Sequence, residues 1–181
     1  MPGMEKNIYF IGPRASGKTS VGQELAARIG WDFLDLDEEI VSRAGQSIAG
    51  IVEKNGWEYF RRLEAEALKR ACTRSRHVVS AGGGVVEKAE NRNILQENGK
   101  VFLLTSEVKV LLNRLQADND EQMRPRLTDK GVEDELEEIM QARLPLYLEC
   151  AEYILDADRT VESLVEEIEI ILELDEEETD D

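Results

Sequence analysis

Residues 12–19 read Gly12-Pro13-Arg14-Ala15-Ser16-Gly17-Lys18-Thr19, which fits the pattern G-x-x-x-x-G-K-[ST]. This run follows an apolar segment, residues 7–11, and opens an amphipathic segment, residues 18–29. A strand, a glycine-rich turn and a helix start in this order bring backbone N–H groups to the positive end of a helix dipole, where they bind phosphate oxygens. In such loops the lysine reaches the β- and γ-phosphates, and the threonine hydroxyl ligates Mg²⁺. The sequence therefore predicts a nucleoside triphosphate site rather than a chance glycine-rich turn.

Outward from this loop, short apolar segments alternate with longer amphipathic ones. We expect strands at residues 7–11, 32–37, 77–80, 100–105 and 153–156, and helices at residues 18–29, 38–44, 47–54, 58–72, 90–98, 108–115, 133–150 and 161–174. Gly30 is expected to end the first helix and Thr160 to cap the last. Strands separated by helices predict a parallel sheet covered on both faces, an α/β three-layer sandwich formed by one domain, residues 1–181. Ligands of such folds bind at the carboxyl ends of the strands.

Two acids, Asp35 and Asp37, end the second predicted strand. The strand period of two places both carboxylates on the same side of the chain. Near a phosphate loop, one acid is suited to hold Mg²⁺ through a water and the other to accept a hydrogen bond from an attacking hydroxyl. The alternative is a solvated strand end that caps the next helix.

Arginines and glycines at three further points favour an anionic ligand. Arg61 and Glu64 are three residues apart on a predicted helix, so the carboxylate can orient the guanidinium toward a substrate carboxylate. An ordinary surface ion pair is the alternative. Arg143 lies near a helix end, where the helix dipole alone also favours a cation. Gly82-Gly83-Gly84 follows the third strand and either presents N–H groups to a ligand or forms a flexible loop.

The segment 116–131 is polar and has little apolar periodicity. Irregular segments of this length inside a compact domain are usually functional. Because it contains Arg124 and Pro125, we expect a mobile lid whose arginine closes over the phosphates. A solvated loop is the alternative.

The net charge of −17 argues against nucleic acid as a partner, because that binding depends on neutralising phosphates. We find no apolar run of about 18 residues and no signal-peptide pattern, so we expect a cytoplasmic protein without a membrane partner. Cys72 and Cys150 have no metal-ligand spacing and are expected to be free thiols. The acidic tail, residues 173–181, is expected to be solvated and frayed.

Taken together and in this order, the motifs resemble the shikimate kinase family. The resemblance spans essentially the whole chain and rests on Gly12–Thr19, Asp35-x-Asp37, Phe60-Arg61-x-x-Glu64, Gly82-Gly83-Gly84, Arg124-Pro125 and Arg143-x-Pro145-Leu146-Tyr147. It implies phosphorylation of the 3-hydroxyl of shikimate by ATP with Mg²⁺, on the route to chorismate. It also implies a nucleoside monophosphate kinase-like sheet of order 2-3-1-4-5 and a monomer.

The resemblance assigns roles to individual residues. Asp37 would bind the 3-hydroxyl and act as the base, and Lys18 and Arg124 would complete the catalytic set. The nucleotide would be bound by Gly12, Ala15, Ser16, Gly17, Lys18, Thr19, Ser20, Arg114 and Arg124. Shikimate would be bound by Asp37, Gly82, Gly83 and Gly84, with Arg61 and Arg143 on its carboxylate. Thr19 and Asp35 would hold Mg²⁺.

Three residues depart from the family pattern: Ala15 and Arg126 stand where glycine and an apolar residue are common, and Trp57 follows Gly56. Two rival functions are considered. One is a kinase of similar fold that acts on gluconate or a nucleoside monophosphate, against which the two aspartates and the glycine run argue. The other is a nucleotide-dependent switch, whose turnover would not depend on a small acid.

Overall fold

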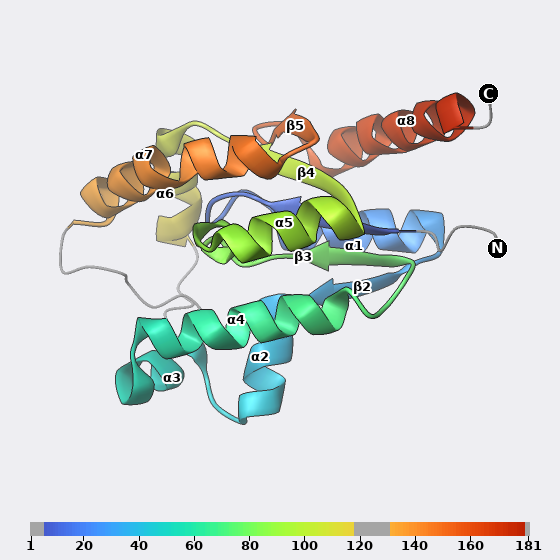
Figure 1. Ribbon diagram of the computed structural model, residues 1–181. Coiled ribbons are helices and arrows are strands. Elements are labelled where there is room, and N and C mark those ends of the chain that lie inside the picture. Colours follow the sequence, from blue (N-terminus) through green and yellow to red (C-terminus); the bar gives the residue numbers. More distant parts are fainter. Residues whose placement is uncertain (1–5, 118–130, 180–181) are drawn as a thin grey trace.

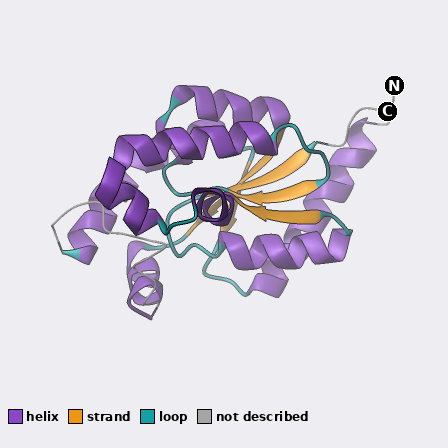
Figure 2. Cartoon of the chain, turned by 90° about the horizontal axis from the view of Figure 1, so that it is seen from below, coloured by secondary structure: helices purple, strands orange, loops and turns teal. Residues whose placement is uncertain are grey.

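A five-stranded parallel sheet lies at the centre of the molecule, between helices on both of its faces (Figures 1 and 2). The computed structural model describes residues 6–117 and 131–179, with side chains up to residue 173. The sheet order is β2-β3-β1-β4-β5, as the family resemblance implies, and each neighbouring pair is parallel. The strands are β1 Asn7–Ile11, β2 Asp32–Asp35, β3 His77–Ser80, β4 Gly99–Thr105 and β5 Tyr153–Asp156.

The helices connect these strands and form the outer two layers. They are α1 Lys18–Ile29, α2 Leu36–Ala44, α3 Ile48–Asn55, α4 Trp57–Ala71, α5 Ala89–Asn98, α6 Val108–Ala117, α7 Val132–Cys150 and α8 Val161–Thr179, with the short 3-10 turn η1 Val85–Glu87. The predicted lid lies mostly in residues 118–130, outside the described residues. Helix α8 continues beyond the expected end at residue 174.

Every residue of β1 is buried, because both faces of the sheet are covered. Ile8 and Phe10 pack into one core with α1 and α8, where Leu25 and Val165 are fully buried. Tyr9 and Ile11 face the opposite core, which contains residues of α2, α3, α4, α5 and α7. The sheet therefore separates two apolar cores, as expected for a three-layer sandwich.

Helix ends follow the chemistry of their cap residues. Gly30 has a left-handed φ of 68° and donates its N–H to Ala26, which ends α1 as predicted. The Thr160 hydroxyl accepts a hydrogen bond from the Ser163 N–H at 3.2 Å at the start of α8, which confirms the predicted cap.

Cys72 and Cys150 are both free thiols. No helix in the described part of the chain is long and apolar enough to cross a lipid bilayer.

The prediction of a strand through Asp37 is wrong. Strand β2 ends at Asp35, and Leu36 and Asp37 already belong to the first turn of α2. The Asp35 carboxylate accepts hydrogen bonds from the backbone N–H groups of Asp37 and Glu38, at 3.0 and 3.4 Å. This N-cap stops the strand and starts the helix, so a helical turn and not a strand repeat sets the relation between the two acids.

Candidate functional site

The loop after β1 is shaped by its left-handed residues. Gly17 has a φ of 92° and precedes the first residue of α1, and Ala15 has a φ of 60° although it carries a Cβ. Left-handed geometry costs a non-glycine residue about 1–2 kcal/mol. Lys18 Nζ donates to the carbonyl oxygens of Gly12 and Pro13, at 3.0 and 2.7 Å, so the lysine lies folded over the loop.

A cavity of about 370 Å³, here called cavity A, opens at the carboxyl ends of β1, β2 and β3. Parallel strands direct their following loops to this edge of the sheet. The lining includes predicted residues of every kind, for catalysis, for the acceptor, for the metal and for the nucleotide: Ala15, Lys18, Thr19, Ser20, Asp35, Asp37, Arg61, Gly82, Gly83, Gly84 and Arg143. Segments far apart in the sequence therefore meet in one cavity.

Thr19 and Asp35 lie side by side in cavity A. The Thr19 hydroxyl donates to Asp35 Oδ2 at 2.9 Å, while Asp35 Oδ1 caps α2. Mg²⁺ bound to substrate phosphates typically takes one or two protein oxygen ligands and keeps several waters. A hydroxyl and a carboxylate beside a phosphate loop fit that requirement. The described residues contain no group of three or more His, Cys, Asp or Glu residues arranged for a metal.

Asp37 is a carboxylate in an environment that favours its protonated form. Burial raises its pKa to about 6, and the Asp35 carboxylate adds to the rise, while Lys18 and Arg61 oppose it. Its Oδ1 is inaccessible to solvent and has no hydrogen-bond partner among the described residues. A carboxyl with a pKa moved toward neutrality is suited to accept a proton from a hydroxyl.

At Gly82 and Gly84 the surrounding side chains leave no space for a Cβ, although neither residue has a left-handed φ. A Cβ on Gly82 would lie 2.5 Å from Glu64 Oε1 and 3.0 Å from Asp37 Oδ1. A Cβ on Gly84 would overlap the guanidinium of Arg61. At these two positions the glycine run is therefore a packed wall of cavity A, against which charged groups lie, and not a flexible loop.

Arg61 is held on α4 by a carboxylate from its own helix. Its Nη1 donates to Glu64 Oε2 at 2.9 Å, and the Glu64 side chain is only 1% exposed. Burial raises the pKa of Glu64, and the Arg61 charge opposes the rise. The Arg61 guanidinium lies 5.4 Å from the ring centroid of Trp57, within the range of a cation–π contact. Trp57 lines cavity A and also packs against the apolar core, so it lies between the two.

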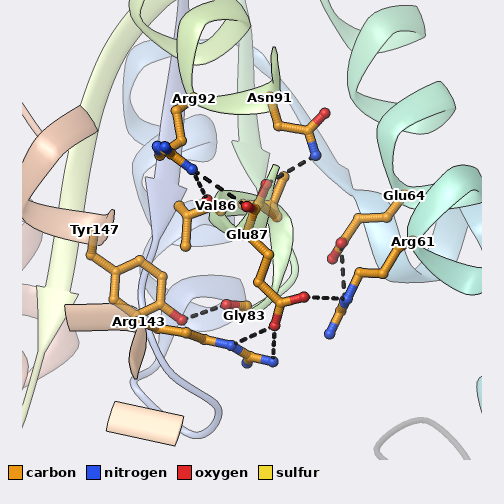
Figure 3. A network of polar contacts seen from close by, with 10 residues as sticks. Arg61, Glu64, Gly83, Val86, Glu87, Asn91, Arg92, Arg143 and Tyr147 are labelled. Atoms are coloured by element: carbon orange, nitrogen blue, oxygen red, sulfur yellow. Dashed lines mark hydrogen bonds and ion pairs between the residues drawn. The ribbon is translucent and has the colours of Figure 1, made fainter. Parts of the chain in front are cut away.

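Arg143 reaches the same cavity from α7, and its side chain is 8% exposed. Both of the arginines predicted for a substrate carboxylate contact one further acid, Glu87 (Figure 3). Close by, the Tyr147 hydroxyl of α7 donates to the Gly83 carbonyl oxygen, which ties the glycine run to that helix.

A second cavity, cavity B, lies on the other side of the phosphate loop. Its lining contains the loop residues Ala15–Ser20 together with Val21, Arg114, Ala157, Arg159, Val161 and Leu164. Arg114 donates to the Ala15 carbonyl oxygen at 3.3 Å and to the Ala157 carbonyl oxygen at 2.7 Å. The predicted nucleotide residues Ser16, Gly17 and Arg114 line this cavity and not cavity A.

The two cavities share one wall. Ala15, Lys18, Thr19 and Ser20 line both of them. A ligand in each cavity would therefore meet its neighbour at the glycine-rich loop after β1, with Lys18 between them. This geometry fits two substrates that exchange a phosphoryl group.

Sequence reasoning missed several charged residues of the site, among them Arg14, Arg159 and Glu87. Arg14 lines cavity A, where burial lowers its pKa to about 10 and the nearby Glu135 carboxylate opposes the shift. Arg14 occupies a variable position of the glycine-rich motif, and its positive charge there could have indicated a role in the site. Arg159 in cavity B and Glu87 beside cavity A lie in no motif.

Two predicted nucleotide residues are not among the described residues that line the two cavities. Gly12 accepts a hydrogen bond from Lys18 through its carbonyl oxygen, and Arg124 lies outside the described residues.

The chain is similar to known proteins of one family along most of its length. A sequence model of the shikimate kinase family matches residues 14–173. A shikimate kinase of Nitratidesulfovibrio vulgaris is 45% identical over 165 residues, which are 91% of this chain and 94% of that protein. Shikimate kinase 2 of an Enterobacter species is 42% identical and covers 94% of this chain and 98% of its own length.

Solved structures give the same result. A shikimate kinase from Acinetobacter baumannii, determined in complex with shikimate, superposes with a TM-score of 0.87 at 35% identity and covers 93% of this chain and 94% of its own. A gluconokinase from Sinorhizobium meliloti has a TM-score of 0.56 at 20% identity, with 91% and 89% coverage, and therefore shares only the fold. The chain belongs to the shikimate kinase family.

Proposed function

We propose that this chain transfers the γ-phosphate of ATP to the 3-hydroxyl of shikimate and releases shikimate 3-phosphate and ADP. The observation that carries this proposal is the wall shared by cavities A and B. It gives one phosphate loop two ligand sites, one of which contains a carboxyl with a raised pKa and two arginines. Family membership supports ATP as the phosphate donor.

In the proposed reaction the hydroxyl oxygen attacks the γ-phosphorus, and the bond from this phosphorus to the bridging oxygen of ADP breaks. Asp37 accepts the hydroxyl proton. Lys18 and the loop N–H groups stabilise the charge that develops on the transferred group. Arg124, which lies outside the described residues, is proposed to act on the same phosphates. Mg²⁺, when bound, would neutralise phosphate charge, and Thr19 and Asp35 are the residues proposed to hold it.

The acceptor is held at its other end by Arg61 and Arg143. Their guanidinium groups line cavity A and supply charged N–H donors for a carboxylate, with Gly83 and Gly84 beside them. Cavity A therefore offers a cationic end for the acid group of shikimate and a carboxylate end for its hydroxyl. Gluconate also carries a carboxylate and hydroxyls, which makes it the comparison acceptor.

The test is a coupled ADP assay with the full chain, ATP and Mg²⁺, in which shikimate, gluconate, a nucleoside monophosphate and no acceptor are compared. We expect ADP release to depend on shikimate and the product to be shikimate 3-phosphate by mass spectrometry. Turnover that does not change when shikimate is added would instead support a nucleotide-dependent switch. Preferred turnover of gluconate or the monophosphate would identify a different kinase.

We further infer that residues 1–181 form one domain that acts as a monomer in the cytoplasm, without a nucleic-acid or membrane partner. The net charge of −17 supports the exclusion of nucleic acid. Residues 116–131 are proposed as the lid and residues 173–181 as a solvated acidic tail. Analytical ultracentrifugation with and without both substrates tests the monomer.

A further inference from the structure

Glu87 joins the two arginines that line cavity A. Its Oε2 accepts from Arg61 Nε at 3.0 Å. Its Oε1 accepts from Arg143 Nε at 2.9 Å and from Arg143 Nη2 at 2.5 Å. One carboxylate therefore bridges two guanidinium groups that belong to different helices, α4 and α7, as Figure 3 shows.

This bridge offsets a repulsion that the site would otherwise contain. The Arg61 and Arg143 side chains are only 13% and 8% exposed, so water screens their charges poorly. Two cations so close together would move apart or change rotamer without a shared anion. Glu64 contacts Arg61 from one side, and among the described residues Glu87 is the acid with ion pairs to both arginines.

Glu87 contacts the arginines from outside the cavity. Within the described residues, the lining of cavity A includes Arg61 and Arg143 but not Glu87. The terminal nitrogens of Arg61 instead lie against Gly84, and Nη1 of Arg143 lies toward Gly83. Both glycines line cavity A, and Arg61 Nη1 already donates to Glu64, so Arg61 Nη2 and Arg143 Nη1 are the terminal nitrogens beside the space that a substrate carboxylate would enter.

The backbone that carries Glu87 is firmly held. The Glu87 N–H donates to the Gly84 carbonyl oxygen at 3.0 Å, and Val85 and Val86 are fully buried. From α5, Asn91 Nδ2 donates to the Val85 carbonyl oxygen at 2.9 Å, and Arg92 Nη1 donates to that of Val86 at 2.7 Å (Figure 3). The turn η1 therefore places the Glu87 carboxylate at a defined point between the two arginines.

We propose that Glu87 is a positioning residue that fixes the spacing and orientation of Arg61 and Arg143 and so determines the affinity of the enzyme for the carboxylate of its acceptor. This inference rests on the proposed function. It differs from a role as a competing anion, in which Glu87 would leave the arginines when the substrate arrives and would weaken binding. The two roles predict opposite changes in the KM for shikimate.

The experiment compares Glu87→Gln with the native chain. A glutamine keeps the size of the side chain, but its amide oxygen can accept from only one guanidinium while its NH₂ faces the other. We expect the KM for shikimate to rise roughly tenfold, the lower end of the effect of removing a group that orients a metal ligand, with kcat changed less than about twofold. The KM for ATP should stay unchanged, because cavity B does not contain these arginines.

Two controls separate positioning from a general loss of structure. Glu90→Gln removes the same charge from an exposed acid on α5 that pairs with Lys69, and it should leave both KM values unchanged. Glu87→Asp retains the carboxylate and should recover part of the affinity, which keeps the test valid if the glutamine variant folds poorly.

A second substrate tests the carboxylate directly. The methyl ester of shikimate has no anionic group for the arginines, so Glu87→Gln should change its kcat/KM by less than about twofold. An unchanged or lower KM for shikimate in the variant, or an equal loss with the ester, would overturn the inference. If the native chain did not phosphorylate shikimate at all, the proposed function would fail instead.

Discussion

Asp37 occupies a position where its ionisation is unfavourable, and this is the property that suits it to accept a proton. The pKa of about 6 means that the side chain is mostly ionised at pH 7 and still close to the point of protonation. The buried Oδ1, without a hydrogen-bond partner in the described part of the chain, contributes to this cost. Reactivity and stability therefore make opposite demands on this residue.

Asp37→Asn should separate these two demands. We expect kcat to fall by roughly 10²–10⁴-fold, the usual contribution of a general base, with a smaller change in shikimate affinity. Removing an unfavourable charge should also raise the free energy of unfolding at pH 7 by on the order of 1–2 kcal/mol, a value reduced because the side chain lines cavity A and is only partly buried. Steady-state kinetics and thermal melts measure the two effects, and a variant with native kcat would remove Asp37 from the role of base.

The pH dependence of kcat/KM should report the same group. Because the folded pKa of Asp37 is raised to about 6, its proton-accepting form is lost as the pH falls through that value. We expect kcat/KM for shikimate to decline below pH 6, toward tenfold per pH unit, whereas an ordinary aspartate would stay ionised to about pH 4. A flat profile down to pH 5, at pH values where the protein remains folded, would contradict the assignment.

The space beside Gly84 and Gly83 differs, and so should the effect of adding a methyl group at each position. Gly84→Ala should displace the Arg61 guanidinium and raise the KM for shikimate, with little effect on the KM for ATP. Gly83→Ala should raise it less, because the nearest atoms to the added methyl lie 3.6 Å away, at ordinary contact distance. Equal effects of the two substitutions would show that the run acts through flexibility and not through space.

The junction of β2 and α2 performs two tasks with one side chain. Asp35 caps the helix with Oδ1 and accepts the Thr19 hydroxyl with Oδ2. Its position depends on the helix that it starts, and that helix also carries Asp37 in its first turn. A change at Asp35 therefore affects both the fold and the site.

Asp35→Ala should cost about 1 kcal/mol of stability through the lost cap, and should also lower kcat and raise the Mg²⁺ concentration needed for half-maximal rate. Ser47→Ala is the matched control, since Ser47 caps α3 by accepting from the Gly50 N–H at 3.2 Å and does not line cavity A. It should lose a similar stability and keep native kinetics. Native activity in both variants would reduce Asp35 to a cap.

This junction also shows where sequence reasoning reached its limit. The structure has strands at residues 7–11, 77–80 and 153–156, with the predicted bounds. Short apolar runs between turn residues are typical of buried strands. The residues Asp35-Leu36-Asp37 fit both the end of a strand and the N-cap of a helix. In the structure Asp35 caps α2, so the helix begins where the strand was expected to continue. Glu87 could not be found, because its role arises from contacts with Arg61 and Arg143 that only the folded chain creates.

The sheet order brings the loops after β1, β2 and β3 to one edge, and α7, which packs along one side of the sheet, supplies Arg143 (Figure 1). The ordered motifs allowed the family and the sheet order to be predicted from sequence. The division of the site into two cavities was not predicted. It depends on α6 and α8 closing one side of the loop, and no motif marks that packing.

The wall between the cavities has a thermodynamic consequence. A ligand that orders Ala15–Ser20 from one side alters the surface that the other ligand meets, so occupancy of either side should change the dissociation constant on the other by an identical factor. Titration calorimetry of shikimate with and without a non-hydrolysable ATP analogue, and the reverse titration, should both give a factor of about five or more. If neither dissociation constant changed when the other ligand was bound, the loop would be rigid enough to keep the two cavities energetically independent.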